Sequence, residues 1–255
     1  MALSGENFLR YSRQLLMADI GESGQERLLR SRVLVVGLGG LGCPVTLYLA
    51  AAGVGQLTLC DPDKVDRTNL QRQILYREAD CGSLKVDAAR RELTALNPGV
   101  ELIPYAREAD DELLAQVASG QFDVVVDCTD NLAARHRLNR ACSPAGVALV
   151  SAAAMGWEGQ LLTLDFRSRA GPCLACAIPE GSDEPLMNCG NSGVVGPVLG
   201  AMGSLQAIAA LRMLLGKPVS HGRLQRYDGT SGRWLDLSIR ARVDCPVCAA
   251  SESKN

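Results

Sequence analysis

The fold of this chain is decided by the stretch Val33-Leu34-Val35-Val36-Gly37-Leu38-Gly39-Gly40-Leu41-Gly42. Four consecutive apolar residues are typical of a strand that is buried on both faces of a parallel sheet. The glycines lead into a helix predicted over residues 41–52, and a second apolar run, 57–60, ends at Asp61. Strand, glycine turn, helix, strand and acid together have the spacing of a dinucleotide-binding βαβ unit.

The alternation of helices and strands continues beyond this unit and indicates a doubly wound, Rossmann-like α/β sheet that is mainly parallel. The pattern predicts helices at 7–30, 85–96, 110–119, 133–145 and 198–215, and strands at 100–105, 122–127 and 148–151. After about residue 154 it changes, and antiparallel strands are expected at 160–166, 223–227 and 234–239. We expect one domain over 1–255, with N-terminal helices (1–30), a nucleotide-binding core (31–154) and a C-terminal part (155–255).

Composition excludes several classes of protein. Only 4% of the 255 residues are aromatic and the net charge is −2 with no long basic run, which argues against nucleic-acid binding. The N-terminus carries Glu6, Arg10 and Arg13 and lacks the apolar core of a signal peptide, so a cytoplasmic location is expected. Residues 185–211 contain no charge, but their Gly, Asn and Pro residues favour a loop and a buried helix over a membrane span.

The candidate nucleotide site combines the glycine turn with later charged residues. Backbone N–H groups at the turn can bind phosphates, and Asp61 can accept hydrogen bonds from ribose hydroxyls. Taken alone, these features fit NAD-dependent dehydrogenases as well as ATP-using enzymes. Arg72 and Lys85 favour phosphate cleavage, because negative charge moves onto a leaving pyrophosphate. Asp130 follows the 122–127 strand, where a carboxylate could hold Mg²⁺. The alternatives are solvated surface charges for the two cations and a helix N-cap for Asp130.

The cysteines indicate a metal site. The chain has ten, and two C-x-x-C pairs, Cys173/Cys176 and Cys245/Cys248, have the spacing of a closed tetrahedral zinc site. We predict that this zinc is structural and ties the C-terminal tail back to residues 165–180; a redox pair or unliganded thiols are the alternatives. Cys189 lies in a polar loop, either as a nucleophile that forms a thioester or acyl disulfide or as a bystander thiol.

In the order and spacing of its motifs the chain resembles the ThiF/MoeB/HesA family of ubiquitin-activating-like adenylyltransferases over nearly its full length. The matching pieces are Arg10–Gln14, Gly37–Gly42, Asn69–Gln73, Lys85, Asp127–Asn131, residues 193–207 and both cysteine pairs. Asn188-Cys189 and Cys245-Pro246-Val247-Cys248 resemble the ThiF branch, which activates the sulfur carrier of thiazole synthesis. The MoeB branch, which serves the molybdopterin sulfur carrier, is the alternative.

The resemblance implies ATP and Mg²⁺ as cosubstrates, a β-grasp carrier ending in Gly-Gly, and a sulfurtransferase or cysteine desulfurase as the partner that supplies sulfur. It also implies a homodimer in which Arg13 reaches the ATP of the neighbouring subunit, and catalytic roles for Arg13, Arg72, Lys85, Asp130 and Cys189. The nucleotide-binding residues that it implies are Gly37, Gly39, Gly40, Gly42, Asp61, Asn69, Arg72, Gln73, Lys85, Asp130 and Asn131.

Such a reaction requires no general base, because a C-terminal carboxylate is already ionised at neutral pH. The only histidines, His136 and His221, are therefore assigned no role; His136 stands between Arg135 and Arg137 on an expected solvated helix face, and His221 in a turn. An NAD-linked oxidoreductase is disfavoured because it needs a well-placed acid. A scaffold without catalysis is disfavoured because the charged set is complete.

Overall fold

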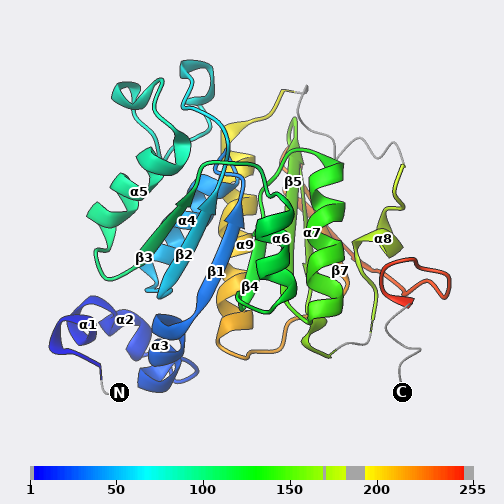
Figure 1. Cartoon of the computed structure of the whole chain (residues 1–255), viewed down its shortest axis with the longest axis horizontal. Coiled ribbons are helices and arrows are strands. Elements are labelled where there is room, and N and C mark those ends of the chain that lie inside the picture. The colour runs from blue at the N-terminus through cyan, green and yellow to red at the C-terminus, as the bar shows by residue number, and fades with distance from the viewer. Residues whose placement is uncertain (1–2, 169–170, 182–192, 250–255) are drawn as a thin grey trace.

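An eight-stranded sheet forms the centre of the computed structural model, which describes residues 3–168, 171–181 and 193–249 (Figure 1). Its order is β3-β2-β1-β4-β5-β6-β7-β8. The strands are β1 (Arg32–Val36), β2 (Gln56–Cys60), β3 (Glu101–Tyr105), β4 (Val124–Asp127), β5 (Ala148–Met155), β6 (Glu158–Leu164), β7 (Arg223–Asp228) and β8 (Arg233–Ser238). Neighbours from β3 to β5 are parallel, and β5 to β8 are antiparallel. The predicted mainly parallel sheet with antiparallel C-terminal strands is confirmed.

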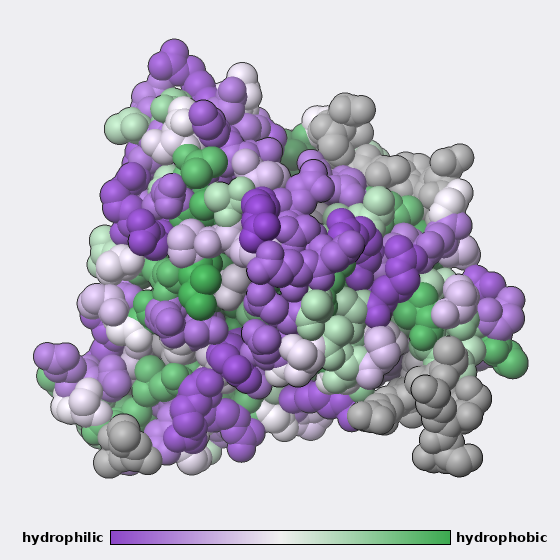
Figure 2. All heavy atoms as spheres, in the orientation of Figure 1, coloured by the Kyte–Doolittle hydropathy of each residue, from purple (hydrophilic) through white to green (hydrophobic). Residues whose placement is uncertain are grey.

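Helices cover both faces of the sheet, and the sheet separates the core into two apolar layers. The helices are α1 (Gly5–Arg10), α2 (Ser12–Leu15), α3 (Gly21–Arg30), α4 (Gly42–Ala51), α5 (Lys85–Leu96), α6 (Asp111–Ala118), α7 (Leu132–Ala145), α8 (Leu174–Ala177) and α9 (Gly196–Leu214). Val33 and Val35 of β1 face the layer with α4, α5 and α9, while Leu34 and Val36 face α6, α7 and α8. Figure 2 shows mostly hydrophilic residues, with a few apolar patches, on the face that α6 and α7 cover.

Helix α9 is long and apolar enough to span a membrane by length and composition alone. It packs instead against α4 and β5, and more than half of its apolar window is buried. Its small residues allow this close packing, because a Cβ at Gly203 would lie 2.5 Å from the carbonyl oxygen of Leu41. The prediction that residues 185–211 form a loop and a buried helix, and no membrane span, is therefore confirmed for the part that belongs to α9.

Two differences from the predicted elements affect the site. Strand β5 continues to Met155 rather than stopping near 151, because its second half pairs with β6. The short helix α8 begins directly after Cys173 and was not predicted. In addition, the N-terminal helical region is divided into α1, α2 and α3, with a turn over residues 16–20.

Candidate active site

A pocket of about 810 Å³ opens at the carboxyl ends of the parallel strands. Segments distant in the sequence build it: the turn after β1, residues 60–63 and 69–73, Lys85, and the turn after β4. The predicted residues that line it are Gly37, Gly39, Gly40, Asp61, Asn69, Arg72, Gln73, Lys85, Asp130 and Asn131. Gly42 lies next to this pocket but is not part of its lining. The sheet edge thus brings nearly all the predicted nucleotide-binding residues together.

The glycines of the turn serve two different purposes. Gly37 has φ +91°, and a Cβ there would lie 2.6 Å from the carbonyl oxygen of Cys128, so only glycine fits. A Cβ on Gly42 would lie 2.0 Å from the carbonyl oxygen of Gly37. Gly39, by contrast, has room toward the pocket, where the nearest atom is Gln73 Nε2 at 3.6 Å. Gly37 and Gly42 shape the turn, and Gly39 leaves its backbone open to a ligand.

Asp61 is buried and holds the glycine turn. One of its carboxylate oxygens accepts a hydrogen bond from the Leu38 N–H at 2.7 Å, and the other accepts one from the Asp63 N–H at 2.9 Å. Burial raises the pKa of the Asp61 carboxyl, an effect that the charge of Lys85 and the two N–H groups partly offset. Lys85 Nζ, also buried, lies 3.6 Å from Asp61 and 2.8 Å from Asp63. This cation therefore faces the pocket with two carboxylates beside it.

Arg72 and its neighbours form a second polar group at the pocket. Its Nη2 donates a hydrogen bond to Asn69 Oδ1 at 2.5 Å, and its Nη1 donates to the carbonyl oxygen of Thr68 at 3.3 Å. The N-terminus of α9 packs closely here, because a Cβ on Gly196 would lie 2.9 Å from the carbonyl oxygen of Gln71. Gln73 is buried, and its Oε1 has no hydrogen-bond partner among the described residues.

The turn between β4 and α7 presents Asp130 at the pocket. Asn131, not Asp130, is the N-cap of α7, since its Oδ1 accepts from the Ala134 N–H at 2.8 Å. The N-cap alternative for Asp130 is therefore wrong. Asp130 is exposed, and within the described ranges its carboxylate has no hydrogen bond or ion pair. It is free to bind a cation.

Two predicted catalytic residues are not part of this pocket as the structure describes it. Arg13 lies on α2, where it is exposed, and it does not line the pocket of its own chain. Cys189 lies outside the described residues.

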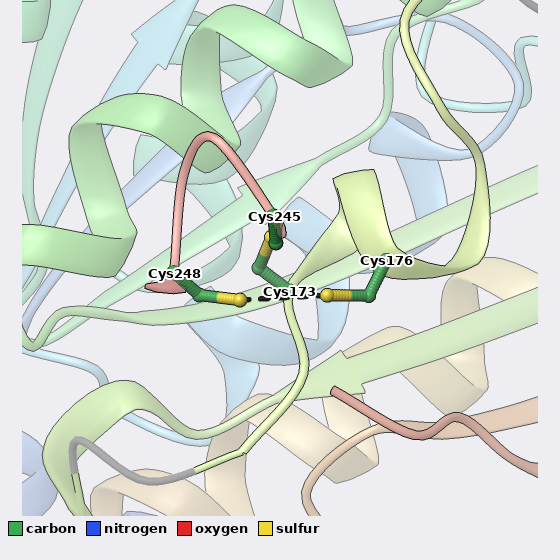
Figure 3. A group of neighbouring side chains, drawn as sticks. All are labelled: Cys173, Cys176, Cys245 and Cys248. Carbon is green, nitrogen blue, oxygen red and sulfur yellow. Dashed lines mark hydrogen bonds between the residues drawn. The ribbon is translucent and has the colours of Figure 1, made fainter. Parts of the chain in front are cut away.

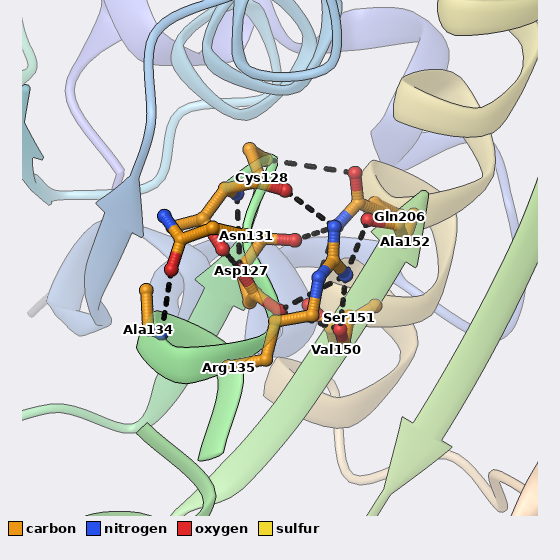
Figure 4. A network of polar contacts seen from close by, with 10 residues as sticks. Asp127, Cys128, Asn131, Ala134, Arg135, Val150, Ser151, Ala152 and Gln206 are labelled. Carbon is orange, nitrogen blue, oxygen red and sulfur yellow. Dashed lines mark hydrogen bonds and ion pairs between the residues drawn. The ribbon is translucent and has the colours of Figure 1, made fainter. Parts of the chain in front are cut away.

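The predicted solvated face of α7 is wrong, because Arg135 and His136 are buried. Neither ring nitrogen of His136 has a hydrogen-bond partner among the described residues, and burial lowers its pKa. Arg135 instead lines the pocket and forms an ion pair with buried Asp127, as Figure 4 shows. Sequence reasoning missed Arg135; the available signal was the i, i+4, i+8 spacing of Asn131, Arg135 and Asn139.

The four predicted zinc ligands converge away from the pocket (Figure 3). Cys173 is the N-cap of α8 and Cys176 lies within that helix, while Cys245 and Cys248 lie on the C-terminal tail. All four Sγ atoms lie within 4.8 Å of one another, with 3.6 Å between Cys173 and Cys245 and 3.4 Å between Cys176 and Cys248. A tetrahedral Zn–S distance of about 2.3 Å implies sulfurs about 3.8 Å apart, so the cluster could hold zinc.

Neighbouring polar groups support this cluster. The backbone N–H of Arg242 donates to Cys176 Sγ at 3.3 Å. Asn139 of α7 accepts from the Leu174 N–H at 2.9 Å, which fixes the start of α8 beside Cys173. With four protein ligands available, no position is left for a catalytic water.

Comparison with known proteins gives the class of this chain. The ThiF family model matches residues 11–247, and the chain belongs to this family. It is 44% identical over 251 residues to the sulfur carrier protein ThiS adenylyltransferase of Escherichia coli strain K12, covering 98% of this chain and 99% of that protein. It is 43% identical over 248 residues to the molybdopterin-synthase adenylyltransferase of the same organism, covering 96% and 98%.

A longer relative also matches this chain, and a solved structure shares its fold. The chain is 43% identical to the adenylyltransferase and sulfurtransferase MOCS3 of Drosophila yakuba and spans 55% of that protein. Escherichia coli MccB, solved with ATP, shares the fold at a TM-score of 0.78 and 23% identity, covering 96% of this chain and 76% of MccB.

Proposed function

We propose that this chain uses ATP to adenylate the C-terminal Gly-Gly carboxylate of a small ubiquitin-like sulfur carrier protein. The observation that carries the proposal is the grouping of Arg72, Lys85 and the unpaired Asp130 around one pocket at a glycine-rich turn. The relatives named above, which are adenylyltransferases of matching length or contain one, support the same chemistry. None of these names supports the oxidoreductase alternative.

The reaction requires two anions to approach each other. A carboxylate oxygen of the carrier attacks the α-phosphorus of ATP, and the bond from that phosphorus to the bridging oxygen breaks. Pyrophosphate leaves with the electron pair, and no proton is transferred. Arg72 and Lys85 would offset the charge of the triphosphate, and Asp130 would hold Mg²⁺. When bound, the metal supplies further neutralisation of the leaving group.

Gly39, Gly40 and Asn69 would contact the phosphates, and Gln73 would contact the nucleotide through its buried carboxamide. Asp61 is the expected ribose ligand, although it already holds the turn. Arg13 does not reach the pocket of its own chain, which supports its proposed action on a partner subunit in a homodimer. Cys189 would act after adenylation, in sulfur transfer.

The C-terminal sheet is the proposed carrier-binding part. Trp157 and Trp234 are about half exposed, and Trp234 stacks against Tyr227 with 4.7 Å between ring centroids. Trp234 lies on the edge strand β8, and Trp157 lies in the turn between β5 and β6, where its carbonyl oxygen accepts from the Gly229 N–H just after β7. Large aromatic side chains exposed in this way favour binding of a partner over a role in chemistry.

The test is to incubate the protein with ATP, Mg²⁺ and each candidate carrier, and to measure the intact mass of the carrier. A gain of one AMP on the C-terminus is expected, with the carrier of thiazole synthesis as the preferred substrate. The molybdopterin sulfur carrier is tested as the second substrate, because the chain's identity to the molybdopterin-synthase adenylyltransferase is only one percentage point lower than its identity to the ThiS adenylyltransferase. Absence of adenylate with every Gly-Gly carrier would contradict the proposal.

Two variants assign the roles within this reaction. Asp130→Ala is expected to abolish carrier-dependent ATP–pyrophosphate exchange, whereas exchange at the wild-type rate would refute the magnesium role. Cys189→Ala is expected to retain adenylation while sulfur transfer fails. Thermal shifts with ATP and Mg²⁺ against NAD provide an independent control, since an oxidoreductase would respond to NAD instead.

A further inference from the structure

A buried ion pair lies directly beneath the β4–α7 turn. Asp127 and Arg135 are at most 1% exposed, with 3.3 Å between Asp127 Oδ2 and Arg135 Nη1. Removing both charges from water costs free energy that their attraction does not reliably return. Such a pair is weak evidence for a stabilising role, but its geometry fixes the groups around it.

The two side chains hold Thr129 from opposite sides. Asp127 Oδ1 accepts from the Thr129 N–H at 3.0 Å and from the Thr129 hydroxyl at 2.7 Å. Arg135 Nη2 donates to the Thr129 carbonyl oxygen, so both polar backbone groups of this residue are fixed. Figure 4 shows the guanidinium reaching from α7 across this turn toward β5.

The guanidinium is itself held in one orientation. Its Nη1 also donates to Ser151 Oγ at 2.9 Å and to the Ala152 carbonyl oxygen at 2.7 Å, both on β5. Ser151 in turn donates to Asp127 Oδ2 at 2.5 Å. The planar guanidinium is bound at four acceptors, including Asp127 Oδ2, and cannot rotate without breaking several hydrogen bonds. A lysine ammonium could not reproduce this arrangement.

Asp130 follows Thr129 directly, and its own side chain has no contact in the described part of the chain that would fix it. The backbone of the turn therefore sets where the Asp130 Cα–Cβ bond points, and with it the region of the pocket that the carboxylate can reach. Arg135 Nε is buried without a partner among the described residues, so Arg135 is held through its Nη atoms alone.

We propose that Arg135 is a positioning residue that, through the Thr129 carbonyl, sets the direction in which Asp130 presents its carboxylate to magnesium-bound triphosphate. The inference rests on the proposed function, because it concerns the metal that Asp130 would hold. It assigns Arg135 no contact with the reacting atoms.

The test measures how much Mg²⁺ strengthens ATP binding. Calorimetric dissociation constants for ATP are determined with excess Mg²⁺ and with excess EDTA, in the absence of carrier, and their ratio gives the enhancement. For Arg135→Lys the enhancement is expected to fall about 10-fold, the lower end of losses from outer-shell metal substitutions. The affinity in EDTA should stay near the wild-type value, because nucleotide contacts that do not involve the metal are retained.

Ser151→Ala keeps both charges and is the second variant. Ser151 does not line the pocket, so a change in the enhancement must act through Asp127 and Arg135, to which Ser151 is hydrogen-bonded. A drop of about 3-fold is expected, smaller than for Arg135→Lys because Arg135 keeps its other acceptors. Arg140→Lys is the matched control: it lies on the same helix, pairs with Glu180, and should leave the ratio unchanged.

Each outcome is decisive. An unchanged ratio in folded Arg135→Lys, or in Ser151→Ala where the lysine variant fails to fold, overturns the positioning role. Equal losses in Mg²⁺ and in EDTA also overturn it, since these indicate a general structural defect. Wild-type protein that does not bind ATP would instead refute the proposed function, and wild-type enhancement retained in Asp130→Ala would refute the magnesium assignment on which this inference depends.

Discussion

Disruption of the cluster of Cys173, Cys176, Cys245 and Cys248 should destabilise the protein by a predictable amount. The perturbation is Cys245→Ser, which removes a buried ligand from the C-terminal tail. Cys176 and Cys245 are 69 positions apart in the sequence. For a cross-link closing a loop of this length, the entropy lost by the unfolded chain stabilises the fold by about 4 kcal/mol at 25 °C. A metal that leaves on unfolding would add its own binding free energy to this figure.

The assay is thermal unfolding together with metal analysis. For a domain of this size, 4 kcal/mol corresponds to a fall in Tm of about 10 °C. Chelation of wild-type protein should reproduce the fall seen in Cys245→Ser. Cys81→Ser is the matched control, because Cys81 is exposed and outside the cluster, and it should leave Tm unchanged. Less than about 0.5 zinc per chain without chelator, or a fall in Tm below about 2 °C, would refute the reasoning.

Three further outcomes are expected. Gly42→Ala should destabilise the fold by about 1–3 kcal/mol in chemical unfolding, because its Cβ would lie 2.0 Å from the Gly37 carbonyl oxygen; the control Gly200→Ala, which meets no atom within 4 Å, should be neutral or stabilising. Arg72→Ala should slow carrier-dependent ATP–pyrophosphate exchange by about 100-fold or more, and a loss below about 3-fold would contradict its role. Burial lowers the pKa of His136 in the folded protein, so its contribution to the free energy of unfolding is fully present above the unfolded pKa and is lost as the pH drops below about 6.5. The Tm of His136→Leu should therefore fall less on acidification than the Tm of the wild type. An equal fall in both proteins would contradict this.

The fold could be predicted from the sequence because its strands and turns are strongly patterned. The apolar run Val33–Val36 and the glycines after it fix β1 and α4, and the helix predicted at 85–96 coincides with α5. The second half of β5 could not be predicted, because Ala152, Ala153 and Ala154 have little strand propensity and are ordered by pairing with β6. Helix α8 is too short to show a periodicity.

The sequence predicted those site residues that belong to a recognisable motif. It did not predict those whose role depends on being buried by the tertiary fold. Asp130 and Lys85 lie at the pocket as expected. Arg135 and His136 were misplaced because adjacent charges on a helix normally indicate a solvated face. The buried side of α7 is polar because Asp127 and Ser151, on neighbouring strands, supply its counter-charge and acceptors. That pairing depends on the tertiary fold.

The pairing of Lys85 with Asp61 and Asp63 has a consequence for turnover. The two carboxylates neutralise the Lys85 ammonium before any nucleotide binds. Triphosphate binding therefore replaces a carboxylate partner of Lys85 with a phosphate, and the binding free energy gains only the difference between these two ion pairs. In the proposed reaction, the exposed Asp63 carboxylate can recapture the lysine as pyrophosphate departs. Under that proposal the same cation would assist bond breaking and then release the product, so that the enzyme would not stay trapped with its highly charged leaving group.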